Sequence, residues 1–208
     1  MSSDFRLDSI IIQSIGNLND QEFLDVACGQ GKWGFAVKLG WSGNPRRSIG
    51  LDIWRRNLEF AKHHEIYDDL ILADARFLPF LDRSFDVVCA CEFLLHVQKS
   101  EGTRVLEEVE RVSRNTVVIS VPNKVVKVGL DRENPYEKDL SGWSAKDLKE
   151  RGYKVRGVGF QVRGRQISRN VLAGLTYLPS LNRFAELIVG KKNVPSRERL
   201  SHLKKRGL

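Results

Sequence analysis

The sequence predicts an α/β fold, a Rossmann-like open sheet of mostly parallel strands with helices on both faces, and three observations support it. Short apolar runs alternate with helix-compatible segments from about residue 20 to residue 122. The first run breaks into a glycine-rich turn, F-L-D-V-A-C-G-Q-G-K-W-G at 23–34, and a helix-compatible segment follows at once. The run F-D-V-V-C-A-C at 85–91 is apolar along most of its length, which is typical of a central strand buried on both faces.

The first half of the chain alternates helices with strands. An opening helix at 4–18 is indicated by Leu7, Ile10, Ile11 and Ile15 at helical spacing. Strands are expected at 22–27, 48–51 and 70–73, and helices at 32–39 and 55–64. In the second of these helices we expect Leu58, Phe60 and Ala61 to face inward.

The second half continues this alternation and then changes. A strand at 85–91, a helix at 102–112 and a strand at 116–121 precede the break at Pro122. A helix follows at 144–151, with Ser144 as its N-cap. Strands at 153–160 and 185–189 have no obvious long crossover helix between them, so we expect an antiparallel pair at the sheet edge.

Size and composition indicate one cytoplasmic domain. The 208 residues allow a single domain at 1–190, with residues 1–18 as a cap helix and 191–208 as a basic tail. No apolar run approaches the roughly 20 residues of a membrane span. The first residues lack the pattern of a signal peptide, and three cysteines form no disulfide framework, as expected in a reducing compartment.

Positive charge is concentrated at the C-terminal end. The whole chain carries a formal charge of +8, but residues 1–150 balance to −4 and residues 151–208 to +12. A basic segment of this kind indicates an anionic partner, such as RNA, a phosphorylated substrate or a membrane surface. A solvated basic face with a loose tail explains it equally well.

Acidic residues follow the expected strands at the edge where open α/β sheets bind ligands. Gly29, Gly31 and Gly34 have the spacing of a dinucleotide-binding turn, and Asp52 closes the next strand. Asp74 follows the third strand, and Glu92 follows Cys91 at the end of the strand at 85–91. This register predicts a nucleotide-like ligand, with Asp52 suited to the two hydroxyls of a ribose.

The charge of Asp25 bears on which nucleotide binds. A pyrophosphate favours a turn without negative charge, whereas Asp25 lies beside this one. A carboxylate there would favour a ligand that bears an ammonium and a sulfonium group. We therefore expect S-adenosylmethionine, with S-adenosylhomocysteine as its product, and no metal.

The chain resembles the class I, Rossmann-like S-adenosylmethionine-dependent methyltransferases of the type 11 group over about residues 20–190. The motifs that carry the resemblance are D-V-A-C-G-Q-G at 25–31, G-L-D-I at 50–53, A-D-A-R-F-L-P-F at 73–80, S-F-D-V-V-C-A-C-E at 84–92 with L-L-H-V at 94–97, and V-V-I-S-V-P-N at 117–123. The family fold implies seven strands in the order 3-2-1-4-5-7-6 with an antiparallel C-terminal pair.

The resemblance also implies roles for residues at the strand ends. The glycine turn would hold the methionine end of the cofactor, Asp52 the ribose, Asp74 with Ala75 the adenine, and the backbone near Cys91 the amino group. The full set of expected cofactor-binding residues is Asp25, Ala27, Cys28, Gly29, Gly31, Trp33, Asp52, Ile53, Asp74, Ala75 and Cys91.

The acceptor side is less defined by sequence. The family often has two histidines after the fourth strand, and here His96 alone remains as the candidate general base, or as a residue that packs on a helix. His96, Tyr136, Trp143, Arg163 and Arg165 are the expected acceptor-site residues, with surface packing as the alternative for the aromatic ones.

Three functions stay open at this point. The first is a methyltransferase for a small molecule or lipid precursor, since no separate RNA-binding module is present. The second is an RNA methyltransferase that uses the basic surface at 151–208. The third is an NAD(P)-binding oxidoreductase or a non-catalytic nucleotide-binding protein, which the charge of Asp25 disfavours.

Overall fold

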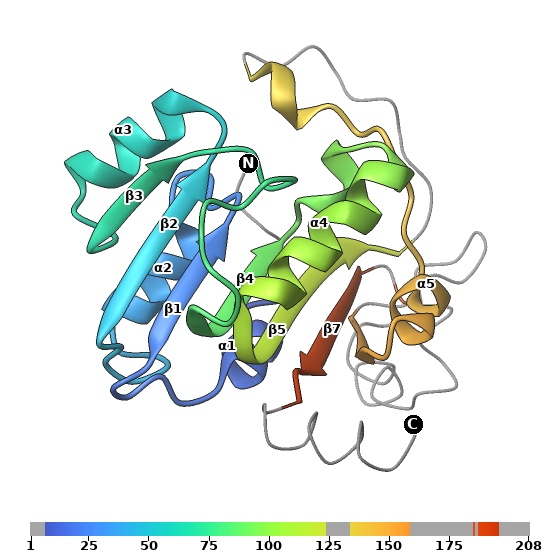
Figure 1. Ribbon diagram of the computed structural model, residues 1–208, viewed down its shortest axis with the longest axis horizontal. Helices are drawn as coiled ribbons and strands as arrows, with labels where there is room; N and C mark the ends of the chain where they lie inside the picture. The colour runs from blue at the N-terminus through green and yellow to red at the C-terminus, as the bar shows by residue number, and fades with distance from the viewer. Residues whose placement is uncertain (1–6, 124–133, 159–184, 186, 196–208) are drawn as a thin grey trace, which may run out of the picture.

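The protein contains a seven-stranded sheet in the order β3-β2-β1-β4-β5-β7-β6, as the resemblance implied (Figure 1). The computed structural model describes residues 7–123, 134–158, 185 and 187–195. The strands from β3 to β5 are parallel, and β7 runs antiparallel to both β5 and β6. The strands are β1 (Glu22–Val26), β2 (Arg47–Asp52), β3 (Asp69–Leu72), β4 (Phe85–Cys91), β5 (Ser113–Pro122), β6 (Lys154–Val158) and β7 (Leu187–Asn193).

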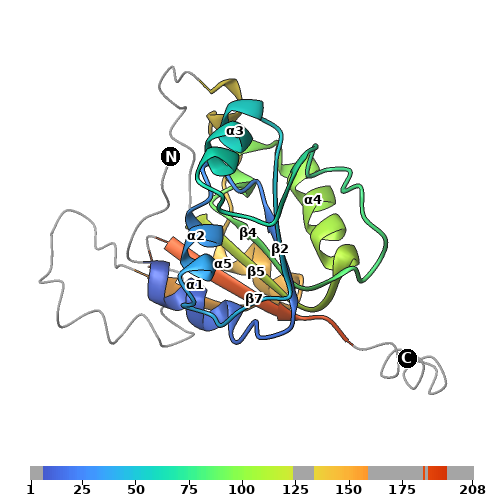
Figure 2. The same ribbon diagram turned by 90° about the vertical axis from the view of Figure 1, so that its left-hand side faces the viewer.

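Helices cover both faces of the sheet. Figure 2 shows α1 and α2 on one side of the sheet and α4 on the other. The hydrophobic contacts place α3 with α1 and α2, and α5 with α4. The helices are α1 (Asp8–Ile15), α2 (Lys32–Lys38), α3 (Arg55–His63), α4 (Lys99–Val112) and α5 (Ala145–Glu150), with 3-10 turns η2 (Leu94–His96) and η3 (Pro135–Glu137). No helix in the described ranges has the length and apolar character needed to cross a membrane.

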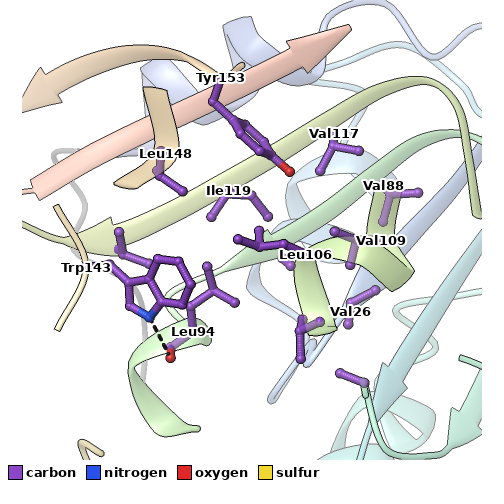
Figure 3. Close-up of a cluster of buried hydrophobic side chains, with 14 of the residues drawn as sticks. Val26, Val88, Leu94, Leu106, Val109, Val117, Ile119, Trp143, Leu148 and Tyr153 are labelled. Atoms are coloured by element: carbon purple, nitrogen blue, oxygen red, sulfur yellow. Dashed lines mark hydrogen bonds between the residues drawn. The ribbon is translucent and has the colours of Figure 1, made fainter. Parts of the chain in front are cut away.

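Two apolar layers hold these helices to the sheet. Because side chains alternate along a strand, Val88 and Ala90 of β4 face one layer, and Val87 and Cys89 face the other. Figure 3 shows the layer beneath α4 and α5, where Leu106 and Val109 of α4 pack over Val88, Val117 and Ile119. The expectation of a central strand buried on both faces is therefore confirmed.

Two helices differ from their expected form. Helix α4 begins three residues early at Lys99, because Gln98 and Glu101 form a reciprocal capping box. In α3, Leu58 and Ala61 are buried as expected, but Phe60 is 40% exposed and stacks on His64. The prediction for Phe60 was wrong because a residue two positions from Leu58 points to nearly the opposite side of a helix.

The C-terminal part of the sheet agrees with the expected antiparallel pair. Ser144 caps α5 with its side chain, as predicted, and Asp147 completes a capping box. Strand β7 extends to Asn193, where it pairs with Thr116 of β5, so the sheet continues past the boundary expected at residue 190.

Candidate functional site

The carboxyl ends of β1, β2, β3 and β4 meet at one edge of the sheet. Strand β1 lies between β2 and β4, with Asp25 opposite Gly50 on one side and Cys89 on the other. The turn after β1 is hydrogen-bonded to β2, since the N–H of Cys28 donates to the carbonyl oxygen of Leu51 at 2.9 Å. This is the point where the strand order reverses, and open α/β sheets bind ligands there.

Asp52 joins β2 to the glycine turn. Its Oδ2 accepts the backbone N–H of Gly29 at 2.9 Å, and its Oδ1 accepts that of Trp54 at 2.8 Å. Burial raises the pKa of Asp52, and the hydrogen bonds from Trp54, Gly29 and the Asn57 side chain oppose that shift. A carboxylate has about four acceptor positions, and the donors from Gly29, Trp54 and Asn57 use three of them, so Asp52 can still accept a hydrogen bond from a ribose.

The turn presents its open side at Gly29. This residue adopts φ 57°, and a Cβ placed on it would meet no atom within 4 Å. Ala27 also adopts a left-handed φ of 55°, a conformation that favours glycine. A left-handed backbone at both residues turns the chain sharply between β1 and α2 and leaves space above Gly29.

Asp25 lies beneath the turn instead of on its open side. Its side chain is buried, and its Oδ2 accepts the hydroxyl of Tyr67 at 2.6 Å. Burial raises the pKa of Asp25 to about 7; the Tyr67 hydrogen bond lowers it and the nearby Asp52 raises it further. Near pH 7 this carboxyl group is therefore only partly ionised, so it favours a cationic ligand less than a fully charged Asp25 would.

Asp74 is engaged by a neighbouring guanidinium. The side chain of Arg76 donates to Oδ1 and Oδ2 of Asp74 at 2.6 to 3.0 Å, and Arg76 also pairs with Glu101 of α4. Burial opposes the shift, but the hydrogen bonds from Arg76 lower the pKa of Asp74 below its usual value. An adenine amine would have to share this carboxylate with Arg76.

The expected cofactor-binding residues divide into two groups by exposure. Ala27, Gly29, Ile53 and Asp74 keep exposed surface at the strand ends. The buried residues are Asp25, Cys28, Gly31, Trp33, Asp52, Ala75 and Cys91. The thiols of Cys28 and Cys89 are buried and their pKa values are raised, for Cys28 by burial first and for Cys89 by the adjacent Cys91 first, as expected of core cysteines.

Glu92 lies directly after β4 and was not among the expected cofactor- or acceptor-site residues. It adopts a left-handed φ of 54°, and its Oε1 accepts the hydroxyl of the buried Ser120 at 2.9 Å. Non-glycine residues in this conformation are enriched at functional sites. The sequence offers one signal for Glu92, namely an acidic residue directly after Cys91 at the end of an expected strand. The left-handed backbone of Glu92 leaves no signal in the sequence.

The segment with η3 contributes to the electrostatics of the site. Glu137 is close enough to Asp52 to raise its pKa. Tyr136 is 48% exposed and stays a candidate for the acceptor site. His96 in η2 has its Nδ1 3.2 Å from the carbonyl oxygen of Lys138 and 3.6 Å from a carboxylate oxygen of Asp139.

Of the three remaining acceptor candidates, the structure describes only Trp143. Trp143 is 3% exposed in the layer beneath α4, where its indole N–H donates to the carbonyl oxygen of Leu94 at 3.1 Å (Figure 3). The structure therefore assigns Trp143 to the core, because its only polar atom is satisfied there. Arg163 and Arg165 lie outside the described residues.

Comparison with known proteins agrees with this geometry. Residues 24–120 match a family described as a methyltransferase domain. The chain is 31% identical over 184 residues to phthiotriol/phenolphthiotriol dimycocerosates methyltransferase 1 of Mycobacterium ulcerans, which covers 84% of this chain and 62% of that protein. It is 30% identical over 119 residues to demethylmenaquinone methyltransferase of Renibacterium salmoninarum, covering 55% of this chain and 46% of that protein.

A solved structure shares the fold over most of the chain. Magnesium protoporphyrin IX methyltransferase from Synechocystis PCC 6803, solved with bound S-adenosylmethionine, matches with a TM-score of 0.57 and 13% identity, covering 94% of this chain and 86% of that one. The shared motifs, the strand order and the family match point to one conclusion. Residues 24–120 match the type 11 group of methyltransferases, and the sheet has the strand order of the class I, Rossmann-like S-adenosylmethionine-dependent methyltransferase fold.

Proposed function

We propose that this protein transfers a methyl group from S-adenosylmethionine to a small molecule or lipid precursor. The observation that carries the proposal is the junction of Asp52 and Gly29, which joins a ribose-type carboxylate to the open side of the turn. The family match supports the reaction class. The S-adenosylmethionine-bound neighbour supports the cofactor only through a shared fold.

The chain's residues fit this cofactor at two of its three parts. Space above Gly29 suits the methionine end, and the oxygens of Asp52 suit the ribose hydroxyls. The adenine end would rest near Ala75, with Asp74 shared between the adenine amine and Arg76.

When bound, S-adenosylmethionine supplies an electrophilic methyl group on a positively charged sulfur. The protein's task is then to orient the acceptor in line with that methyl group and to exclude water. A base is needed only where the acceptor must lose a proton. His96 and Glu92 are the described side chains near the end of β4 that could accept one.

The class of acceptor is inferred from two relatives. The names of the mycobacterial and menaquinone proteins describe methylation of lipid-type acceptors. Because the chain spans 62% and 46% of their lengths, their substrates support only a class, an apolar precursor. The exposed Tyr136 in η3 is our candidate to contact it, because the adjacent Glu137 is close enough to Asp52 to raise its pKa.

A thermal-shift series tests the cofactor assignment against the dinucleotide alternative. Ligands at about a hundred times their dissociation constant stabilise a native state by about 2.7 kcal/mol. We expect the melting temperature to rise with S-adenosylmethionine and S-adenosylhomocysteine and to stay unchanged with NADH and NADPH. A rise with the dinucleotides alone would make the protein an oxidoreductase or a nucleotide sensor.

A further inference from the structure

Tyr67 connects three parts of the fold through one hydroxyl group. It lies between α3 and β3 and is 8% exposed. Its hydroxyl donates to Oδ2 of Asp25 in β1 at 2.6 Å and accepts the backbone N–H of Gly34 in α2 at 3.2 Å. A single oxygen atom therefore joins the strand before the glycine turn to the helix after it.

The ring of Tyr67 fills the space that three glycines leave. A Cβ on Gly34 would overlap the ring, and one on Gly50 would lie 2.7 Å from two ring carbons. A Cβ on Gly31 would lie 3.2 Å from the ring and 2.9 Å from the side chain of Ile66. Gly31 and Gly34 of the G-x-G-x-x-G pattern thus accommodate a tyrosine, whereas Gly29 faces open space.

The position of Asp25 makes Tyr67 more than a packing residue. With 1% of its surface exposed, Asp25 cannot reach the open side of the turn, so its effect there must act through its contacts, which include the backbone N–H of Gly34 as well as the Tyr67 hydroxyl. The titratable groups that interact with it are Tyr67, Asp52, Cys28 and Cys89. Of these four groups, Tyr67 also accepts the backbone N–H of Gly34 in α2, which it shares with Asp25.

We propose that Tyr67 is a positioning residue, whose hydroxyl is held by Asp25 and fixes the first turn of α2 and hence the shape of the glycine turn at Gly29. This inference rests on the proposed function, in which that turn holds the methionine end of the cofactor. A turn held in its binding conformation loses less entropy when the ligand binds, which raises affinity.

The test removes one hydroxyl and keeps the ring. Tyr67→Phe preserves the packing against the glycines, and Tyr153→Phe is its matched control. Tyr153 is 3% exposed, and its hydroxyl donates to Glu110 at 3.0 Å on the other face of the sheet. Both variants therefore lose a buried hydroxyl that donates to a carboxylate.

The first readout needs no ligand. Hydrogen exchange is measured on the peptide that covers residues 29–34 in the wild type and in both variants. We expect exchange about ten-fold faster in Tyr67→Phe and unchanged in Tyr153→Phe, because loss of one buried hydrogen bond is of this size. Equal exchange in all three proteins would overturn the inference.

The second readout is the affinity for S-adenosylhomocysteine from pH 6 to pH 8. We expect Tyr67→Phe to bind about ten-fold more weakly. In the wild type, affinity for this ammonium-bearing ligand should rise with pH as Asp25 ionises. In Tyr67→Phe this rise should occur at a higher pH, because loss of the donor to Asp25 raises the pKa of that carboxyl group. If the wild type binds S-adenosylhomocysteine and Tyr67→Phe binds it with the same affinity and pH dependence, only this inference is overturned. A wild type that does not bind would overturn the proposed function as well.

Discussion

The carboxylate of Asp52 accepts the backbone N–H of Gly29 at 2.9 Å, which ties the end of β2 to the open side of the turn after β1. The two residues are 23 positions apart in sequence and belong to different strand ends. Their contact brings a ribose-binding carboxylate and the space above the turn into one site.

Asp52→Asn should lower the affinity for S-adenosylhomocysteine by about 10- to 100-fold, because a charge-assisted hydrogen bond contributes about 1.5–3 kcal/mol. The amide would also direct an N–H₂ group at Gly29 or Trp54, both of which donate to this carboxylate. Asp69→Asn is the control, since Asp69 forms an exposed pair with Arg47 at the start of β3. Titration calorimetry measures both, and equal losses would show that the effect is not local.

Asp25→Asn should change the pH dependence of stability. The wild-type pKa of Asp25 is raised from 3.8 to about 7, so the unfolded chain loses this proton first as the pH rises. Between about pH 4 and pH 7 the free energy of unfolding therefore falls as the pH rises, by roughly 1 kcal/mol per pH unit from this group. The variant has no carboxyl group at this position, so its stability does not fall with pH for this reason. Its amide oxygen can still accept the hydroxyl of Tyr67.

Urea unfolding at pH 4 and pH 8 checks that prediction. The variant should gain stability relative to the wild type as the pH rises from 4 to 8. A constant difference between the two proteins at both values would mean that Asp25 titrates normally.

Ala27→Gly should stabilise the protein slightly. A left-handed conformation costs a non-glycine residue about 1–2 kcal/mol, and the added chain entropy of glycine offsets part of the gain. Ala36→Gly in α2 is the control and should lose about 1 kcal/mol, because its backbone is helical. Chemical denaturation measures both variants. A similar loss in each would argue against strain at Ala27.

Lys154→Glu should also stabilise the protein. Lys154 lies directly opposite Lys191 in the antiparallel β6–β7 pair. Burial lowers the pKa of Lys191, and the nearby Arg156 and Lys154 lower it further. Exchanging a like-charge cross-strand pair for an opposite-charge pair is worth about 0.5–1 kcal/mol.

The matched control for that change is Lys146→Glu, which breaks an exposed pair with Glu150 and should lose a few tenths of a kcal/mol. In about 1 M salt both effects should shrink, because charges are screened beyond about 3 Å. Lys154, Arg156 and Lys191 belong to the basic surface expected at 151–208, whose described part also includes Arg151 and Lys192, both paired with Glu110. An anionic partner for that surface stays a prediction.

The sequence predicted the strands well because each has a strong local signal. The apolar run 85–91 became β4 with the same bounds, and acidic residues at the expected strand ends came together at one edge. The strand order came from the family resemblance, since no local pattern specifies which strands are neighbours.

The supporting contacts could not be predicted in this way. Tyr67 and Asp25 are 42 residues apart, and nothing in their spacing indicates a hydrogen bond. Asp25 was therefore expected beside the ligand, when it lies beneath the turn. The side-chain pair of Arg76 with Asp74 was likewise missed, because a salt bridge depends on side-chain conformation and leaves no periodic signal.

The most direct test of the central claim is a crystal structure of the protein with S-adenosylhomocysteine. We expect the ribose hydroxyls to lie within hydrogen-bond distance of the Asp52 carboxylate, with the amino-acid end above Gly29. Density for the ligand at any other place in the protein, or a ribose remote from Asp52, would contradict it.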